Sequence, residues 1–147
     1  MLDLPLERIH PLAFRAAVAV ACAADQGLYW EMHDRLFANQ RQLEPWSGHA
    51  EAIGLDAATF DDCMESGRHD AAIRADMKEA AKAGITGTPG FLLAIADAEN
   101  PSKVTGVSTL RGAQPFNVFK TQLDQALLAL SKAGARPVQA GSATHQY

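Results

Sequence analysis

The sequence predicts an α/β protein in which a run of helices is followed by a hairpin of two strands and one last helix. Three observations predict this order. Up to Gly84, apolar residues recur at the three- and four-residue spacing of amphipathic helices. After Pro89 the spacing changes, and residues 91–96 are continuously apolar, which favours a strand covered on both faces. From Gln114 onward, a stripe of large apolar residues returns to helical spacing.

Residues that start or stop helices divide the first part of the chain into five helices. The expected helices cover residues 11–26, 29–39, 45–54, 57–66 and 71–83. Asp56 is a suitable N-cap for the fourth helix, and Gly67 ends it. Gly84 stands where a left-handed C-cap is expected after the fifth.

The second part of the chain predicts a hairpin and a helix. Residues 91–96 and 104–110 are the expected strands, joined by a turn-rich segment that contains Asn100-Pro101. The last helix begins at Gln114-Pro115 and runs to about residue 133. Its apolar stripe consists of Phe116, Phe119, Leu123, Leu127 and Leu130. Residues 134–147 are small and polar, and we expect them to form a disordered tail.

Composition narrows the classes of function. A chain of 147 residues with a net charge of −4 and a pI near 5.7 gives no reason to expect nucleic acid or an anionic membrane as a partner. No apolar run approaches the roughly 20 residues of a membrane-spanning helix. The first residues lack the order of a signal peptide, so the chain as written predicts a cytoplasmic location.

Neither of the two cysteines belongs to a Cys-x-x-Cys pair. Cys22 and Cys63 fall late in, or past the middle of, different expected helices. A reactive thiolate is usually stabilised at a helix N-terminus, so neither cysteine resembles a nucleophile. We expect both to be small buried residues in contacts between helices, with a bridge between them or a redox role as the alternative.

The histidines do not predict a metal centre. The five histidines show no His-x-x-x-His or His-Glu-x-x-His spacing, and no cysteine pair lies near them in the sequence. Surface or capping roles are expected for them. The sequence also contains no Gly-x-Ser-x-Gly elbow and no phosphate-binding loop. It therefore predicts neither a metal nor a cofactor.

The segment Gly87-Thr-Pro-Gly-Phe91 stands at the entrance of the first expected strand. Pro89 has no N–H to donate to a strand partner, so it must lie at the first residue of the strand or just outside it. An X–Pro bond can be cis at a cost of roughly 0.5–1 kcal/mol. Local sequence leaves the isomer open, and a trans proline that separates helix from strand is the alternative.

This segment resembles the Gly-Thr-Pro-x-Phe sequence of the thioredoxin superfamily, specifically its DsbA-like branch. Residues 3–6 and 10–17 resemble the end of that family's second core strand and the helix that follows it. Residues 22–27, 30–37 and 60–67 resemble its helical insertion. The resemblance implies a thioredoxin-like fold that lacks the first core strand and the redox helix. It makes residues 1–133 an incomplete domain, with the insertion at about 28–83, the hairpin and helix at 86–133, and a stub of the second strand near residues 2–6.

By resemblance, the family activity is that of a thiol–disulfide oxidoreductase or disulfide isomerase. It implies that Pro89 is a cis proline and that Thr88 offers its backbone to an extended peptide or protein thiol substrate. The catalytic Cys-x-x-Cys would lie upstream of this chain, so no catalytic residue is expected within it. The chain by itself is then expected to be redox-inactive. Members of the family are often periplasmic or exported.

Two other functions remain open at this stage. One is a non-catalytic module that binds extended peptides by strand addition. The other is an enzyme fragment similar to kappa-class glutathione transferases or hydroxychromene-carboxylate isomerases. If the first core strand is absent, residues 91–96 form an unpaired apolar edge, which would favour self-association.

Overall fold

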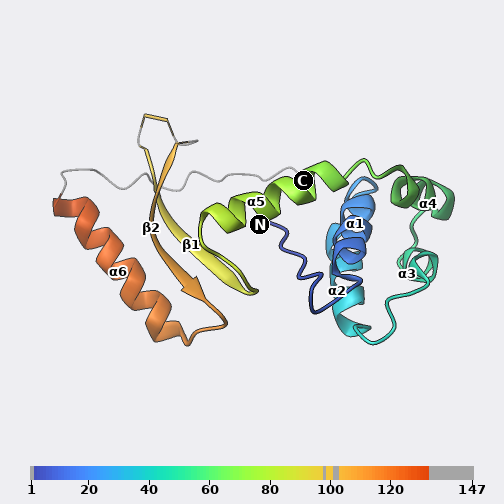
Figure 1. Cartoon of the computed structure of the whole chain (residues 1–147), viewed down its shortest axis with the longest axis horizontal. Coiled ribbons are helices and arrows are strands. Elements are labelled where there is room, and N and C mark those ends of the chain that lie inside the picture. Colours follow the sequence, from blue (N-terminus) through green and yellow to red (C-terminus); the bar gives the residue numbers. More distant parts are fainter. Residues whose placement is uncertain (1, 98, 101–102, 133–147) are drawn as a thin grey trace. The chain divides into compact units, whose positions relative to one another are not determined.

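The computed structural model describes residues 2–97, 99–100 and 103–132. The helices and strands follow the predicted order (Figure 1): α1 (Ala13–Ala24), α2 (Tyr29–Ala38), α3 (Trp46–Ala52), α4 (Ala57–Ser66), α5 (Asp70–Lys82), β1 (Gly90–Ala96), β2 (Val104–Arg111) and α6 (Phe116–Lys132). The tail expected at residues 134–147 lies outside the described residues. The chain divides into two compact units, and the boundary lies within α5, between Glu79 and Ala80.

The first unit is helical and has a closed apolar core. Along α1, Phe14, Val18 and Cys22 are buried at steps of four residues, so they form one stripe on the helix. α1 packs against α2 and α4, while α3 packs against both α2 and α4. The other large side chains of this core include Met32, Leu36, Phe60, Met64 and Ile73. These helices therefore bury their apolar faces against one another.

The predicted helix ends are confirmed. The Asp56 carboxylate accepts a hydrogen bond from the backbone N–H of Thr59 at 2.8 Å, which is the geometry of an N-cap. Gly67 and Gly84 have φ values of +64° and +71°. This left-handed region disfavours residues with a Cβ, so glycine suits the point where each helix stops.

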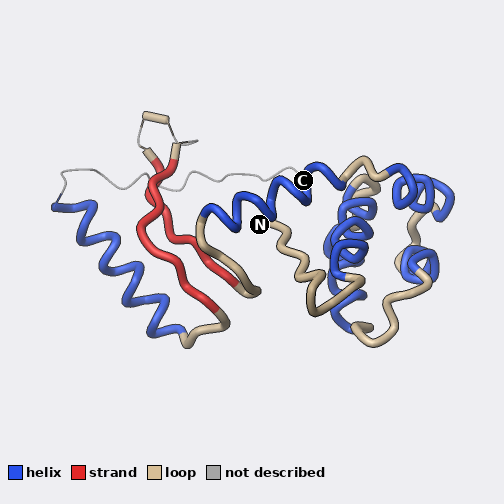
Figure 2. Tube along the Cα trace, viewed as in Figure 1, coloured by secondary structure: helices blue, strands red, loops and turns tan. Residues whose placement is uncertain are grey.

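The second unit contains the hairpin and α6 (Figure 2). β1 and β2 are antiparallel, with Gly90 opposite Arg111 and Ala96 opposite Val104. The register shifts between Leu93 and Ala94, where β2 carries one extra residue in the manner of a β-bulge. α6 packs against β2, and the ring of Phe119 meets that of Phe91 edge to face at 4.9 Å between centroids.

Two expectations were wrong: that β1 is covered on both faces, and that a strand lies near residues 2–6. β1 is not covered on both faces, because Phe91 and Leu92 are 40% and 48% exposed. The α6 stripe is also largely open, with Phe116 79% exposed. Residues 2–6 form no strand. The physical reason is shared: an apolar pattern shows which faces favour burial, but it does not show that a partner element is present.

None of the helices among the described residues combines the length and the apolar character needed to cross a bilayer.

Candidate functional site

The first candidate site is the entrance of β1, where the sequence placed Thr88 and Pro89. The Thr88–Pro89 peptide bond is cis, the isomer that the resemblance implies, and both residues are exposed. The carbonyl of Pro89 accepts a hydrogen bond from the N–H of Gly112 at 2.8 Å, which ties this loop to the end of β2. Arg111 adds a hydrogen bond of 3.2 Å from Nη2 to the carbonyl of Gly84. The loop is therefore held at both ends.

Glycine is required at position 90 by a close approach of the chain. A Cβ on Gly90 would clash with the side chain of Ile85 and lie 3.0 Å from the carbonyl oxygen of Gly87. The glycine thus allows the Gly87–Gly90 loop to fold back on itself beside Pro89.

The backbone at this entrance is open to a partner. No described residue forms a hydrogen bond with the N–H or C=O of Thr88. β1 pairs with β2 along one edge, and its other edge has no strand partner among the described residues. Unpaired donors and acceptors along a strand edge are the groups that an added extended peptide uses.

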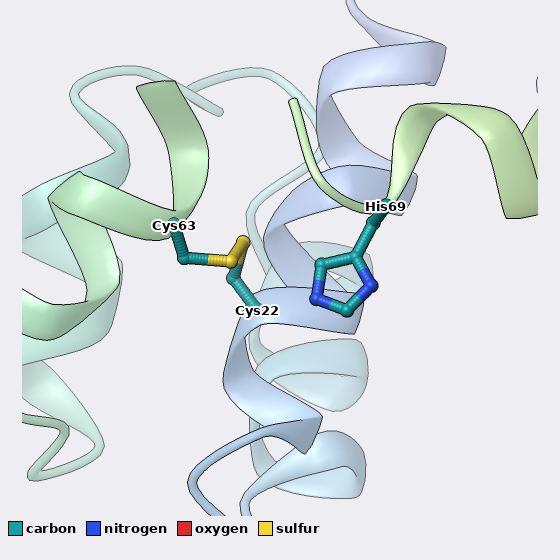
Figure 3. Close-up of side chains that lie close together, drawn as sticks. All are labelled: Cys22, Cys63 and His69. Atoms are coloured by element: carbon teal, nitrogen blue, oxygen red, sulfur yellow. A yellow bond between two sulfur atoms is a disulfide. The ribbon is translucent and has the colours of Figure 1, made fainter. Parts of the chain in front are cut away.

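The second candidate site is a disulfide that the sequence reading did not favour. Cys22 and Cys63 are bonded to each other, with 5.8 Å between their Cα atoms, so the expectation of two unlinked buried cysteines was wrong (Figure 3). Both residues are only 1% exposed. The bond forms because α1 and α4 pack together and turn these two positions toward each other. In this conformation a protein thiol has no direct access to the sulfurs.

Charged and titratable side chains surround this disulfide. Asp25, at the end of α1, accepts hydrogen bonds at Oδ2 from Nε and Nη2 of Arg68, at 3.1 and 2.6 Å. The same oxygen lies 2.7 Å from Nε2 of His69 and 3.7 Å from Sγ of Cys63. Burial disfavours the charged carboxylate, but the hydrogen bonds from His69 and Arg68 outweigh it and lower the pKa of Asp25.

His69 lies near the disulfide in space, although no cysteine pair lies near a histidine in the sequence. A ring nitrogen of His69 and the sulfurs of Cys22 and Cys63 all lie within 4.8 Å of one another. Figure 3 shows the His69 ring beside the disulfide, at the start of the segment that leads into α5. Cys22 and Asp25 are three residues apart and share a helix face, a local signal that the sequence offers. The approach of Cys63 and His69 depends on helix packing, which local spacing does not encode.

Comparison with known proteins finds one family that matches most of the chain and several relatives that match part of it. Residues 2–124 match the family model described as the DSBA-like thioredoxin domain. The chain is also similar to proteins named Na(+)/H(+) antiporter NhaA 1. The protein of that name from Salinispora arenicola is 40% identical over 92 residues, which are 61% of this chain and 14% of that protein. The one from Mycolicibacterium gilvum is 52% identical over 60 residues, which are 39% of this chain and 10% of that protein.

The chain therefore spans only a small part of these curated relatives, whose length it covers by 10% to 14%. The family match, in contrast, extends from the start of the helical unit through the hairpin and into α6. On that match, the chain belongs to the DSBA-like thioredoxin domain family.

Proposed function

We propose that this chain is the substrate-binding part of a thiol–disulfide oxidoreductase and that it binds extended polypeptides at the entrance and open edge of β1. The observation that carries the proposal is the exposed backbone of Thr88, which has no hydrogen-bond partner among the described residues and directly precedes that edge. Family membership supports the assignment to thiol–disulfide chemistry. Main-chain hydrogen bonds would supply the affinity, as in other cases of strand addition.

The chain would bind without turning over a disulfide by itself. Its 147 residues contain no Cys-x-x-Cys, and the Cys22–Cys63 bond is buried. In an insulin-reduction assay, we expect no turnover by this chain. Turnover that disappears in Cys22→Ser or Cys63→Ser would show that the buried pair is the reactive one and would contradict the proposal.

A binding experiment tests the site directly. The probe is fluorescein-labelled insulin B chain with carboxymethylated cysteines, so thiol exchange cannot contribute to the signal. Thr88→Pro removes the backbone donor, whereas Thr88→Ala removes only the side chain. We expect Thr88→Pro to weaken binding at least tenfold, measured by fluorescence anisotropy, and Thr88→Ala to leave it within about twofold.

Circular dichroism serves as the check that both Thr88 variants are folded. Equal binding by the two variants, or no binding by the wild-type chain at millimolar concentration, would contradict a backbone-mediated site. A peptide methylated on alternate backbone nitrogens gives an independent check, because it changes the ligand and leaves the protein intact.

The relatives favour a more specific ligand for the proposed binding site at β1. Long proteins named as Na(+)/H(+) antiporters each contain a segment similar to this chain. We propose that the polypeptide bound by the hairpin is a segment of a membrane transport protein. Synthetic peptides covering the extramembrane segments of such an antiporter should then bind more tightly than scrambled versions of the same composition. Equal affinity would contradict the proposal of a transport-protein segment but not the proposal that the chain binds extended polypeptides in general.

A further inference from the structure

The cluster around the disulfide gathers the kinds of ligand atom that transition metals bind. The ligand atoms of Cys22, Cys63 and His69 lie within 4.8 Å of one another. Asp25 Oδ2 adds a fourth donor, 2.7 Å from Nε2 of His69 and 3.7 Å from Sγ of Cys63. With zinc bonds of about 2.3 Å to sulfur and 2.0–2.1 Å to nitrogen or oxygen, neighbouring ligands of a tetrahedral ion are about 3.3–3.8 Å apart. Movements of about 1 Å or less would bring the oxygen and nitrogen to this spacing.

We propose that reduction of the Cys22–Cys63 disulfide creates a zinc site whose ligands are Cys22, Cys63, His69 and Asp25. Two thiolates, one imidazole and one carboxylate form a ligand set suited to zinc, which accepts sulfur, nitrogen and oxygen donors. The site lies in the helical unit. It does not depend on the proposed peptide-binding edge, which lies in the other unit.

The proposed ligands combine buried sulfurs with partly exposed nitrogen and oxygen donors, as an ion-binding site with an entry path requires. The two cysteines are 1% exposed, so the sulfurs face a dry interior. The side chains of His69 and Asp25 are 23% and 35% exposed and form a rim through which an ion can enter. Arg68, whose side chain is 44% exposed, can release the Asp25 oxygen and remain beside the site.

The charges of the complete site balance. Two thiolates and the Asp25 carboxylate contribute three negative charges, while Zn²⁺ and the neighbouring Arg68 contribute three positive charges. With neutral His69 the sum is zero, which lowers the electrostatic cost of a partly buried site. In the oxidised chain, Asp25 and Arg68 already form an ion pair of 2.6 Å.

The chemistry has two balanced steps. A small dithiol reductant transfers two electrons and two protons, so its own sulfurs become a disulfide while the Cys22–Cys63 bond opens to two thiols. Zn²⁺ then binds the two sulfurs as thiolates and releases two protons to solvent. Because the bond is buried, the reductant reaches it through local opening of the segment between α4 and α5.

Zinc titration of the whole chain tests the proposal. The chain is reduced, desalted without oxygen and titrated with Zn²⁺ against a chromophoric chelator; Co²⁺ is used in parallel, because thiolate-to-cobalt absorption reports sulfur ligands. We expect one ion per reduced chain and no tight binding by the oxidised chain. His69→Gln leaves the disulfide intact in the oxidised state, so this variant can be purified folded. It should bind zinc at least tenfold more weakly after reduction.

His33 provides the matched control, because it also lies beside a carboxylate, with Nδ1 2.9 Å from Oδ1 of Asp34, and it is not part of the cysteine cluster. His33→Gln should retain wild-type affinity. Equal loss in both variants, no binding by the reduced wild-type chain, or zinc binding by the oxidised chain would each overturn the proposal. Far-UV circular dichroism adds a further readout: helix content lost on reduction should return with zinc, and failure to return would also count against the site.

Discussion

The helical unit and the hairpin unit use similar apolar compositions with opposite results. In the helical unit, Phe60 and Met32 are fully buried within a core that α1 to α5 close around a disulfide. In the hairpin unit, the buried apolar residues among those described are two alanines, Ala80 and Ala126, while Phe91 and other large side chains remain exposed. Apolar content alone therefore does not make a core. Closure needs elements on every side, and the open unit is the one that we expect to bind.

The largest predicted effect is a difference in stability between variants that lose an aromatic ring in the helical unit and variants that lose one in the hairpin unit. Phe60→Ala empties a fully buried position and should lower the free energy of unfolding by about 3–5 kcal/mol. Phe116→Ala, at a position 79% exposed, should change it by less than about 0.5 kcal/mol. Urea unfolding followed by circular dichroism measures both. Similar losses would mean that Phe116 is packed in solution and that the second unit is closed.

Opening of the disulfide should have the next largest effect. The Cys22–Cys63 bond closes a loop with a sequence separation of 41 residues, so it restricts the unfolded chain strongly. The double variant Cys22→Ser/Cys63→Ser should lose about 2–4 kcal/mol of stability in the helical unit in the absence of metal. Thermal unfolding followed by circular dichroism measures it. A loss that appears equally in hydrogen-exchange protection of β1 and β2 would show that the two units are not independent.

We expect the chain to self-associate through the open edge of β1. Leu92 is 48% exposed on this strand, and a lysine there places a charge where another strand would pair. We expect the wild-type chain to associate at high concentration and Leu92→Lys to weaken this association by about tenfold, as measured by sedimentation velocity. Leu128→Lys, at a position 60% exposed on α6, is the control and should retain it. If Leu128→Lys weakened association and Leu92→Lys did not, the contact would lie on α6 instead.

The smallest predicted effect is the pH-dependent contribution of Asp3 to the stability of the helical unit. Burial and the nearby carboxylate of Asp76 raise the pKa of Asp3 from its ordinary value of 3.8. The folded chain then holds this proton more tightly than the unfolded chain, so this residue's contribution to stability declines as pH rises above that value. Asp3→Asn should slightly raise the melting temperature at pH 7 and make no difference at pH 3. Asp62→Asn, at an exposed position, serves as the control. An equal gain at both pH values would contradict the charge argument.

Local chemistry accounts for what the sequence predicted well. Asp56 caps α4 because a short side-chain oxygen can accept from the Thr59 N–H three residues on. Gly67 and Gly84 stop helices because they adopt positive φ. These effects act within a few residues, so the order of the helices and of the hairpin strands could be predicted from the chain alone.

Features that depend on contacts between distant elements could not be read in this way. The Cys22–Cys63 bond and the approach of His69 require α1 and α4 to pack in one particular rotation. The exposure of Phe91 and Leu92 depends on which elements cover β1, and an apolar run has the same composition whether or not it is covered. The peptide-binding candidates Thr88 and Pro89 came from resemblance to a family, and the cluster around Asp25 was missed.

Hydrogen exchange with the carboxymethylated insulin B chain tests the central claim most directly, because it locates the bound peptide without any substitution. We predict that saturating peptide slows exchange at residues 86–96, from the entrance of β1 along its open edge, and leaves the core helices α1 and α4 unchanged. Protection confined to α1 to α4, with no change in residues 86–96, would contradict the assignment of binding to the open unit.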